Sequence, residues 1–161
     1  MPEYALTPYR PALSDGLAGL WETVFGDPAP LVRQFLDLWP GSDFCLTALQ
    51  NGIVSAAAYA LPGLTILRPG QPDLPARYLY AVATHPDHRD RGLAAMLCQR
   101  LRDDCFARGE LLLTKPAEPS LYAWYAEKIG AVPTLPCRTL TVTEPAAGTV
   151  TRLSPEEYAA R

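Results

Sequence analysis

An apolar run, a short loop with one glycine and a helix-patterned stretch follow one another between residues 78 and 108. The run is Tyr78 to Thr84, the loop contains Arg89-Asp90-Arg91-Gly92, and the helical stretch begins at Leu93. A strand, loop and helix in this order present several unpaired backbone N–H groups to one point in space. The positive end of the helix dipole lies at that same point. The sequence therefore predicts a phosphate-binding loop that needs no metal ion.

The rest of the chain alternates helix-like and strand-like patterns. Asn51-Gly52 joins two apolar runs, 44–49 and 53–61, which is the strongest short signal for a β-hairpin. Apolar periodicity and the positions of glycine and proline predict the remaining elements. In chain order they are a strand at 4–9, a helix that ends at Gly26, a helix from about Pro30 to Trp39, the hairpin, a strand at 77–84, a helix at 92–108, a strand at 111–114, a helix at 119–129 and a strand at 138–143.

Size and composition limit the class of protein. The chain has 161 residues, of which 48% are hydrophobic and 19% are charged. It is most simply one globular domain with a substantial core. The net charge of −3 argues against nucleic-acid binding, because neutralising phosphates requires a basic surface. No apolar run approaches the roughly 20 residues that span a bilayer, and the N-terminus lacks a signal pattern. We therefore expect no nucleic acid or membrane partner, and a cytoplasmic location.

The four cysteines, Cys45, Cys98, Cys105 and Cys137, show neither a C-x-x-C motif nor paired metal-ligand spacing. Cys98 and Cys105 share one face of a predicted helix, about 10 Å apart along its axis. A disulfide requires Cα atoms within about 7 Å, so these two cannot pair with each other. We expect all four thiols to be reduced and none to be catalytic. His85 and His88 are expected to lie in a surface loop, without a metal.

Two motifs give the chain a family resemblance. Arg89, Gly92 and Ala94 fill the pattern R/Q-x-x-G-x-G/A, which resembles the cofactor-binding motif of the GNAT superfamily of acetyltransferases. The segment 111–130 resembles the other signature of that family, Pro-Ala followed by L-F-x-F-Y-x-K-x-G. The resemblance covers about residues 5–143. It implies an α/β fold with flanking helices and a mixed, strongly twisted central sheet, whose fourth and fifth strands splay apart to admit the pantetheine of the cofactor.

The same resemblance implies transfer of an acetyl group from acetyl-CoA to a primary amine, directly and without a metal or a covalent enzyme intermediate. Backbone N–H groups in the loop and first helical turn would hold the pyrophosphate, and backbone groups at the end of the preceding strand would meet the pantetheine amide. The implied cofactor-binding residues are Val82, Ala83, Thr84, Arg89, Asp90, Arg91, Gly92, Leu93, Ala94 and Ala95. Asp90 adds a carboxylate there, which weakens anion binding unless its side chain turns to solvent.

Tyr125 matches the tyrosine of the second signature, which implies that it protonates the departing thiolate. One extra residue separates it from Gly130, so that counting back from the glycine selects Ala126 instead, and Tyr122 is a reserve candidate. The strand at 111–114 has no glutamate to act as a base. Glu118, just after it, is the nearest carboxylate, and it is either the general base or a solvated acid at a helix N-terminus.

Several alternatives stay open. A non-catalytic GNAT-fold module that binds CoA for regulation also fits the sequence, whereas another nucleotide-binding fold is disfavoured by the absence of its glycine motifs. Trp21, Phe25, Phe35 and Trp39 lie where the resemblance places the acceptor, but their helical spacing favours a core role. A GNAT domain is expected over residues 1–145. Residues 146–161 would form an extension that starts a helix or a second domain, and a homodimer is a further hypothesis.

Overall fold

The computed structural model describes residues 3–39, 41–134 and 154. Its elements are β1 (Ala5–Pro8), the 3-10 turn η1 (Pro11–Leu13), α1 (Ser14–Phe25), α2 (Ala29–Asp37), β2 (Cys45–Gln50), β3 (Ile53–Ile66), β4 (Leu74–Thr84), the 3-10 turn η2 (Pro86–His88), α3 (Leu93–Ala107), β5 (Leu111–Leu113) and α4 (Ser120–Ile129). This order confirms the predicted one as far as α4. The strand expected at 138–143, Cys137 and the boundary at residue 145 lie outside the described residues.

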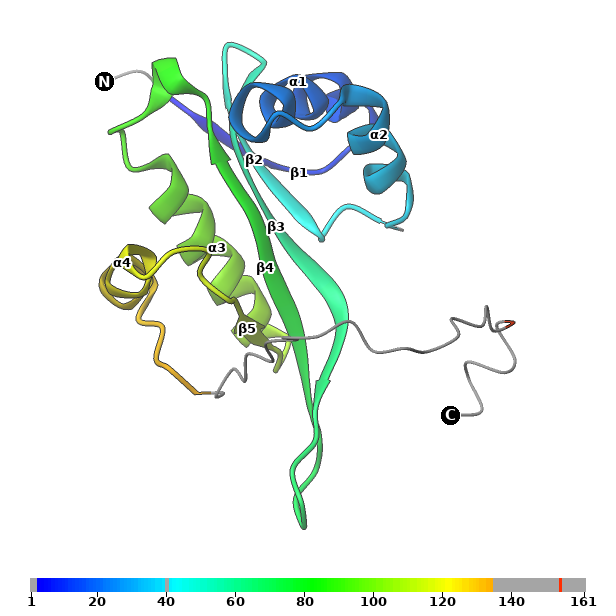
Figure 1. Ribbon diagram of the computed structural model, residues 1–161, viewed down its shortest axis with the longest axis vertical. Helices are drawn as coiled ribbons and strands as arrows, with labels where there is room; N and C mark the ends of the chain where they lie inside the picture. Colours follow the sequence, from blue (N-terminus) through cyan, green and yellow to red (C-terminus); the bar gives the residue numbers. More distant parts are fainter. Residues whose placement is uncertain (1–2, 40, 135–153, 155–161) are drawn as a thin grey trace, which may run out of the picture.

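The strands form one mixed sheet in the order β1-β2-β3-β4-β5. The first four strands pair antiparallel with their neighbours, and β5 lies parallel to β4. Helices α1 and α2 cover one face of this sheet, while α3 and α4 cover the other (Figure 1). Each face has its own apolar cluster, because the strands alternate side chains between the two faces.

Strands β4 and β5 separate early. Their pairing covers only Ala76 to Tyr78 opposite Leu111 to Leu113, whereas β4 continues to Thr84. Just past the last pair, the hydroxyl of Thr114 donates a hydrogen bond of 3.1 Å to the carbonyl of Leu79. Beyond this point a fork opens between the two strands, which confirms the predicted splay of the fourth and fifth strands.

A β-bulge in β4 lies directly beyond the start of the fork. Between the pairs Tyr59–Tyr80 and Ala57–Ala83, β4 has one more residue than β3, and Ala81 has a φ of 44°. The extra residue breaks the alternation of side chains. Tyr80 and Ala81 both pack toward α1 and α2, and only Val82 turns toward α3.

The hairpin of β3 and β4 is longer than the sequence predicts. Strand β3 reaches Ile66 rather than residue 61, and β4 begins at Leu74 rather than residue 77, so part of the expected proline-rich loop is strand. The register shifts near Pro62 and Gly63, where Gly63 has a φ of 98°. A bulge in β3 therefore accommodates Pro62 without ending the strand. Figure 1 shows this hairpin arm projecting beyond the body of the domain.

A buried arginine ties the base of the arm to its surroundings. The side chain of Arg77 is only 8% exposed, and it pairs with Glu110 and Asp43 at 2.7 Å each. Its guanidinium also donates to the backbone carbonyls of Asp43 and Ala60. Arg108 contacts the same carboxylate of Glu110 at 2.9 Å. This network fixes β4 against the starts of β2 and β5, next to the fork.

Candidate functional site

The loop before α3 has the geometry of an anion-binding site. Helix α3 begins at Leu93, after Gly92, and within the described part of the chain no side chain caps its first turn. The residues Asp90, Arg91 and Gly92 are exposed. The N–H groups of the first turn therefore point outward at the positive end of the helix dipole, where an anion is stabilised.

Two residues of this loop have left-handed backbone conformations. Gly92 has a φ of 74°, which a glycine adopts without steric cost. A Cβ added to Gly92 would meet no atom within 4 Å, so in the described structure the backbone angle, rather than crowding, favours glycine there. Asp90 has a φ of 60°, and aspartate is one of the few other residues that tolerate this region. Asp90 is exposed, so its carboxylate is solvated, the arrangement that interferes least with an anion.

A hydrogen-bond network holds the loop from the other end of the sequence. Nη1 of Arg91 donates to the hydroxyl of Tyr4 at 2.8 Å, and Nη2 donates to the carbonyl of Asp87 at 3.0 Å. The hydroxyl of Tyr4 also lies 3.0 Å from Nδ1 of His88. Tyr4 carries no sequence signal for this role, because no local pattern links residues so far apart. Arg89 is exposed beside this network.

The end of β4 offers one free edge toward the fork. Ala83 and Thr84 pair with β3 through Ala57 and Ala56, which leaves the opposite edge of this strand segment without β5 as a neighbour. Ala83 is buried and Val82 packs toward α3, so their side chains fix the segment in place. An unpaired strand edge binds an extended chain through its backbone groups.

Tyr125 lies on α4 beside the start of the fork. It is half-buried and packs against the cluster formed by α3, β4 and α4. Burial raises its pKa, while a hydrogen bond with Thr114 lowers it; the net pKa is raised. Because Thr114 is itself bonded to Leu79, Tyr125 is placed where β4 and β5 part.

The other two candidates on α4 are exposed. Ala126, which counting back from Gly130 would select, faces solvent, and Tyr122 is 49% exposed. The extra residue before the glycine is accommodated at the helix end. There, Ala131 donates to the carbonyl of Tyr125 and Gly130 has a φ of 68°. The geometry therefore favours Tyr125 over both alternatives as the residue directed at the fork.

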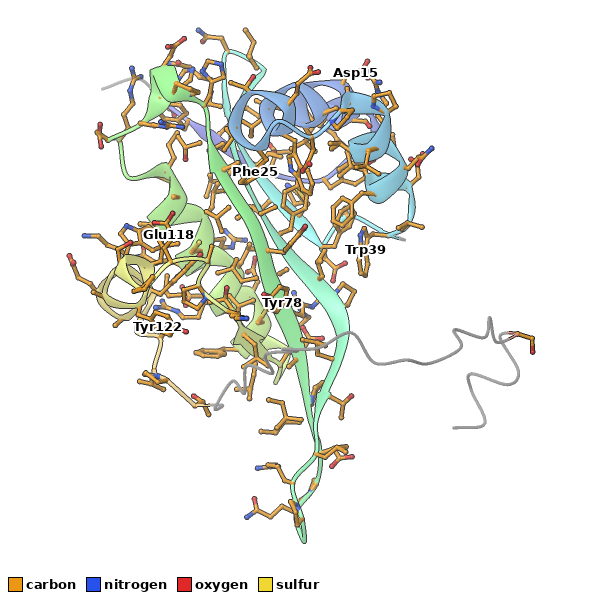
Figure 2. All side chains as sticks on the ribbon, in the orientation of Figure 1. Asp15, Phe25, Trp39, Tyr78, Glu118 and Tyr122 are labelled. Carbon is orange, nitrogen blue, oxygen red and sulfur yellow. The ribbon has the colours of Figure 1, made fainter. Side chains whose placement is uncertain are left out.

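Glu118 is exposed at the start of α4, where its carbonyl accepts a hydrogen bond of 3.1 Å from the N–H of Leu121. Figure 2 shows Glu118 on the α4 side of the sheet, opposite the side that carries Phe25 and Trp39. The structure thus brings Tyr125 to the fork and leaves Glu118 at the surface, near the N-terminal end of a helix.

The aromatic residues of the first two helices divide into two groups. Trp21 is buried and its Nε1 donates to the hydroxyl of Tyr59 at 2.9 Å, so the core expectation is confirmed for this residue. Phe25 is 45% exposed, and for it the core expectation is wrong. Phe35 and Trp39 are half-buried against the same cluster.

The described cysteines, Cys45, Cys98 and Cys105, are buried and unpaired with one another. Burial raises the pKa of Cys98 to about 12, and it also raises the pKa of Cys45 and Cys105. Thiols in this state are not nucleophiles at neutral pH. Across residues 3–39, 41–134 and 154, no three His, Cys, Asp or Glu side chains are grouped so as to hold a metal. The same residues include no helix long and apolar enough to cross a membrane.

A mixed sheet with a forked β4–β5 pair and an uncapped helix after β4 defines an acetyltransferase-type fold, and the sequence agrees. The profile of the acetyltransferase (GNAT) domain matches residues 6–126. The chain belongs to this family. No curated protein sequence matches the chain.

Solved structures share the fold at low sequence identity. An aminoglycoside N-acetyltransferase, AAC(6')-Iy in complex with CoA, is 15% identical with a TM-score of 0.67, over 88% of this chain and 95% of that one. Glucosamine-6-phosphate N-acetyltransferase from Arabidopsis thaliana is 16% identical with a TM-score of 0.66, over 88% and 99%. A putative acetyltransferase from Agrobacterium tumefaciens is 23% identical with a TM-score of 0.62, over 86% and 99%.

Proposed function

We propose that this protein is an N-acetyltransferase that moves an acetyl group from acetyl-CoA to a primary amine by direct transfer. The observation that carries the proposal is the layout of β4. One strand leads from the fork at Tyr78, past an unpaired edge at Val82 to Thr84, to the uncapped N-terminus of α3. This path offers the gap in strand pairing, a free strand edge and an uncapped helix N-terminus in succession.

The residues along this path fit the parts of acetyl-CoA. The N–H groups from Asp90 through Ala95 would hold the pyrophosphate, and the guanidinium groups of Arg89 and Arg91 would offset the charge of Asp90. The backbone groups of Val82, Ala83 and Thr84 would pair with the pantetheine amides as an added strand does. Binding of this kind fixes the thioester in the fork, and orientation alone contributes several kcal/mol to catalysis.

The reaction requires three proton movements. A lysine-like amine must lose a proton before it attacks, which costs about 4–5 kcal/mol at neutral pH. The neutral nitrogen then bonds to the carbonyl carbon of the thioester, the carbon–sulfur bond breaks, and the nitrogen releases a second proton to solvent water. Tyr125 would donate its hydroxyl proton to the departing thiolate sulfur. Its raised pKa keeps that proton in place until it is needed.

Glu118 is the proposed proton acceptor, acting through water. Its carboxylate is exposed and lies on the α4 side of the sheet, so an amine that enters from the α1–α2 side would reach it only through intervening solvent. A water chain of this kind is a recognised route for general-base catalysis.

Two measurements test the proposal. Acetyl-CoA should raise the melting temperature, because a ligand that binds only the folded state stabilises it. Release of free CoA should then occur with at least one member of a panel of primary amines and should fall in Tyr125→Phe. Stabilisation without turnover of any amine would favour the regulatory CoA-binding module instead. No stabilisation at a concentration far above a micromolar dissociation constant would contradict both.

A further inference from the structure

Aromatic rings from three elements converge on one side of the fork. The ring of Tyr80 in β4 lies 6.0 Å from the rings of both Trp21 in α1 and Phe35 in α2. Trp21 also contacts Phe25 at 5.6 Å, and Phe35 contacts Trp39 at 6.1 Å. We call these five residues the aromatic wall. The centroid separations are those of favourable edge-to-face and tilted ring pairs.

The aromatic wall borders the fork on the face opposite Tyr125. Pairing between β4 and β5 ends at Tyr78, and Tyr80 follows two residues later on the same strand. The Tyr78 ring lies 6.2 Å from that of Tyr80, so the two tyrosines connect the start of the fork to the wall. Tyr125 lies on α4 and packs against the apolar cluster of the other face. A molecule resting on the wall would therefore reach a thioester held in the fork from the side away from the proposed acid.

The wall is only partly covered, unlike the core behind it. Phe25 is 45% exposed and Tyr80 is 41% exposed, whereas Trp21 is buried and fixed by its hydrogen bond to Tyr59. In addition, Nε1 of Trp39 is buried but has no hydrogen-bond partner among the described residues. Buried donors without partners are rare in folded proteins, since each one costs free energy. Open rings on a rigid base, with an unused donor beside them, are typical of a ligand surface.

The chemistry of this surface suits one class of amine. Exposed aromatic rings stack on planar apolar groups, and their faces attract ammonium cations. Glu22 precedes Phe25 by one turn of α1 and is exposed, which adds a negative charge beside the rings. We propose that the acceptor is a primary amine on a short chain that ends in an aromatic or similar planar apolar group. The inference rests on the proposed transferase function and specifies its substrate class.

The test compares two amines that differ only in the ring. 3-Phenylpropylamine and n-propylamine share the same aminopropyl group, and CoA release is measured with each at saturating acetyl-CoA. We expect the ring to raise kcat/KM by about tenfold, the worth of one good ring contact. Phe25→Ala should remove that advantage, so that the kcat/KM values of the two amines become similar. Phe106→Ala is the matched control, because Phe106 is a 56% exposed phenylalanine on α3, on the other face of the sheet.

A binding measurement separates this inference from the transferase proposal. Saturation-transfer NMR detects 3-phenylpropylamine on the CoA-bound protein without any turnover. Binding that is lost in Phe25→Ala, but with no acetylation, would support the surface and overturn the transferase function. Acetylation of polar amines only, or equal kcat/KM for the two test amines, would overturn the aromatic preference but would not contradict the proposed transferase function. Neither binding nor turnover of any amine would overturn both.

Discussion

The hydroxyl of Tyr4 lies 3.0 Å from Nδ1 of His88, a residue 84 positions further along the chain. The same hydroxyl accepts a hydrogen bond from Nη1 of Arg91, which leaves its own hydrogen free for His88. The rings of Tyr4 and His88 also meet edge to face at 5.9 Å. The residue just before β1 thus anchors the loop that precedes α3, and the position of the proposed anion site depends on it.

Removing the Tyr4 hydroxyl should weaken CoA binding. In Tyr4→Phe the ring contact is kept, but two hydrogen bonds are lost, so that Arg91 keeps only its bond to the carbonyl of Asp87. We expect the dissociation constant of CoA, measured by calorimetric titration, to rise by about three- to tenfold, as for the loss of about 1 kcal/mol. Thr23→Ala, which loses a hydrogen bond on the exposed face of α1, is the control. An unchanged affinity in Tyr4→Phe would remove the anchoring role.

The negative charge of Asp90 should weaken the binding of CoA. Asp90→Asn keeps a residue that tolerates positive φ and removes the charge, so we expect about three- to tenfold tighter binding of CoA, the effect of about 1 kcal/mol at a helix N-terminus. Asp90→Gly should in addition stabilise the fold by about 1 kcal/mol, because it relieves the left-handed conformation. Calorimetric titration and urea unfolding measure the two effects.

The control for Asp90 removes an equal charge at the far end of the same helix. Asp104 in α3 pairs with Arg100 on the exposed surface. Asp104→Asn should leave CoA affinity unchanged, because dipole effects act only near the helix terminus. An equal gain in CoA affinity in Asp104→Asn and Asp90→Asn would show a general charge effect rather than a local one.

Loss of the Tyr125 hydroxyl should slow turnover and spare binding. We expect Tyr125→Phe to lower kcat on the order of 100-fold, the usual contribution of a general acid, with little change in the KM for acetyl-CoA. Steady-state CoA release measures both constants. Tyr122→Phe is the matched control on the same helix, since Tyr122 is 49% exposed. A similar loss in both variants, or in neither, would count against Tyr125.

The pH profile gives a second check on Tyr125. Burial raises its pKa above the ordinary value of about 10 for tyrosine. The protonated form, which is the proposed proton donor, is therefore retained throughout the neutral and mildly basic range. We expect no decline of kcat from this group below about pH 10. A basic limb near pH 8 that disappears in Tyr125→Phe would contradict the raised pKa.

Two glycines of α1 should respond in opposite directions to alanine. A Cβ on Gly16 would lie 2.9 Å from Cγ2 of Val54 in β3, whereas a Cβ on Gly19 would meet nothing within 4 Å. We expect Gly16→Ala to lower the free energy of unfolding by about 1–2 kcal/mol through overpacking. Gly19→Ala should raise it by about 0.5–1 kcal/mol through helix propensity. Urea unfolding compares the pair, and a Gly16→Ala protein as stable as the wild type or more stable would refute the close packing.

Glu110 should make the fold sensitive to acid. Its partial burial raises its pKa, but hydrogen bonds from Arg108 and Arg77 outweigh this, and the net pKa lies below the ordinary value. A depressed pKa means that the carboxylate contributes stability above the unfolded pKa of about 4.3 and loses it as the pH falls through the folded pKa. As the pH falls through this range, the free energy of unfolding should therefore decrease less in Glu110→Gln than in the wild type. Glu127→Gln, which removes a surface ion pair, should behave as the wild type does.

Local sequence signals were sufficient for the element order and for the loop. Asn51 and Gly52 have φ values of 51° and 81°, as a tight hairpin turn requires. Gly26 and Gly130 end α1 and α4 with positive φ, the usual conformation after a helix C-terminus. These features depend on neighbouring residues only. For the same reason the position of Gly92 before α3 could be read directly from the sequence.

Features that depend on distant residues could not be predicted in this way. The bonds that join Tyr4 to His88 and Arg91, and those that join Arg77 to Asp43 and Glu110, link separate strands and loops. The prolines predicted a loop, whereas the structure has an arm of β3 and β4 there. The arm forms because a bulge accommodates Pro62 within the strand. Choosing Tyr125 over Ala126 required the packing of α4 on α3, which the spacing alone does not reveal.

Because of the bulge at Ala81, the free-energy cost of opening the fork arises when the chain folds and not when a ligand binds. Because the extra residue lies between the paired positions of β3 and β4, the bend of β4 is part of the native hydrogen-bond register. The strained backbone angle and the missing ladder bonds therefore lower the stability of the folded chain before any ligand arrives. A ligand that binds along the free edge of β4 finds β5 already separated from it, and none of its affinity is lost to separating the strands.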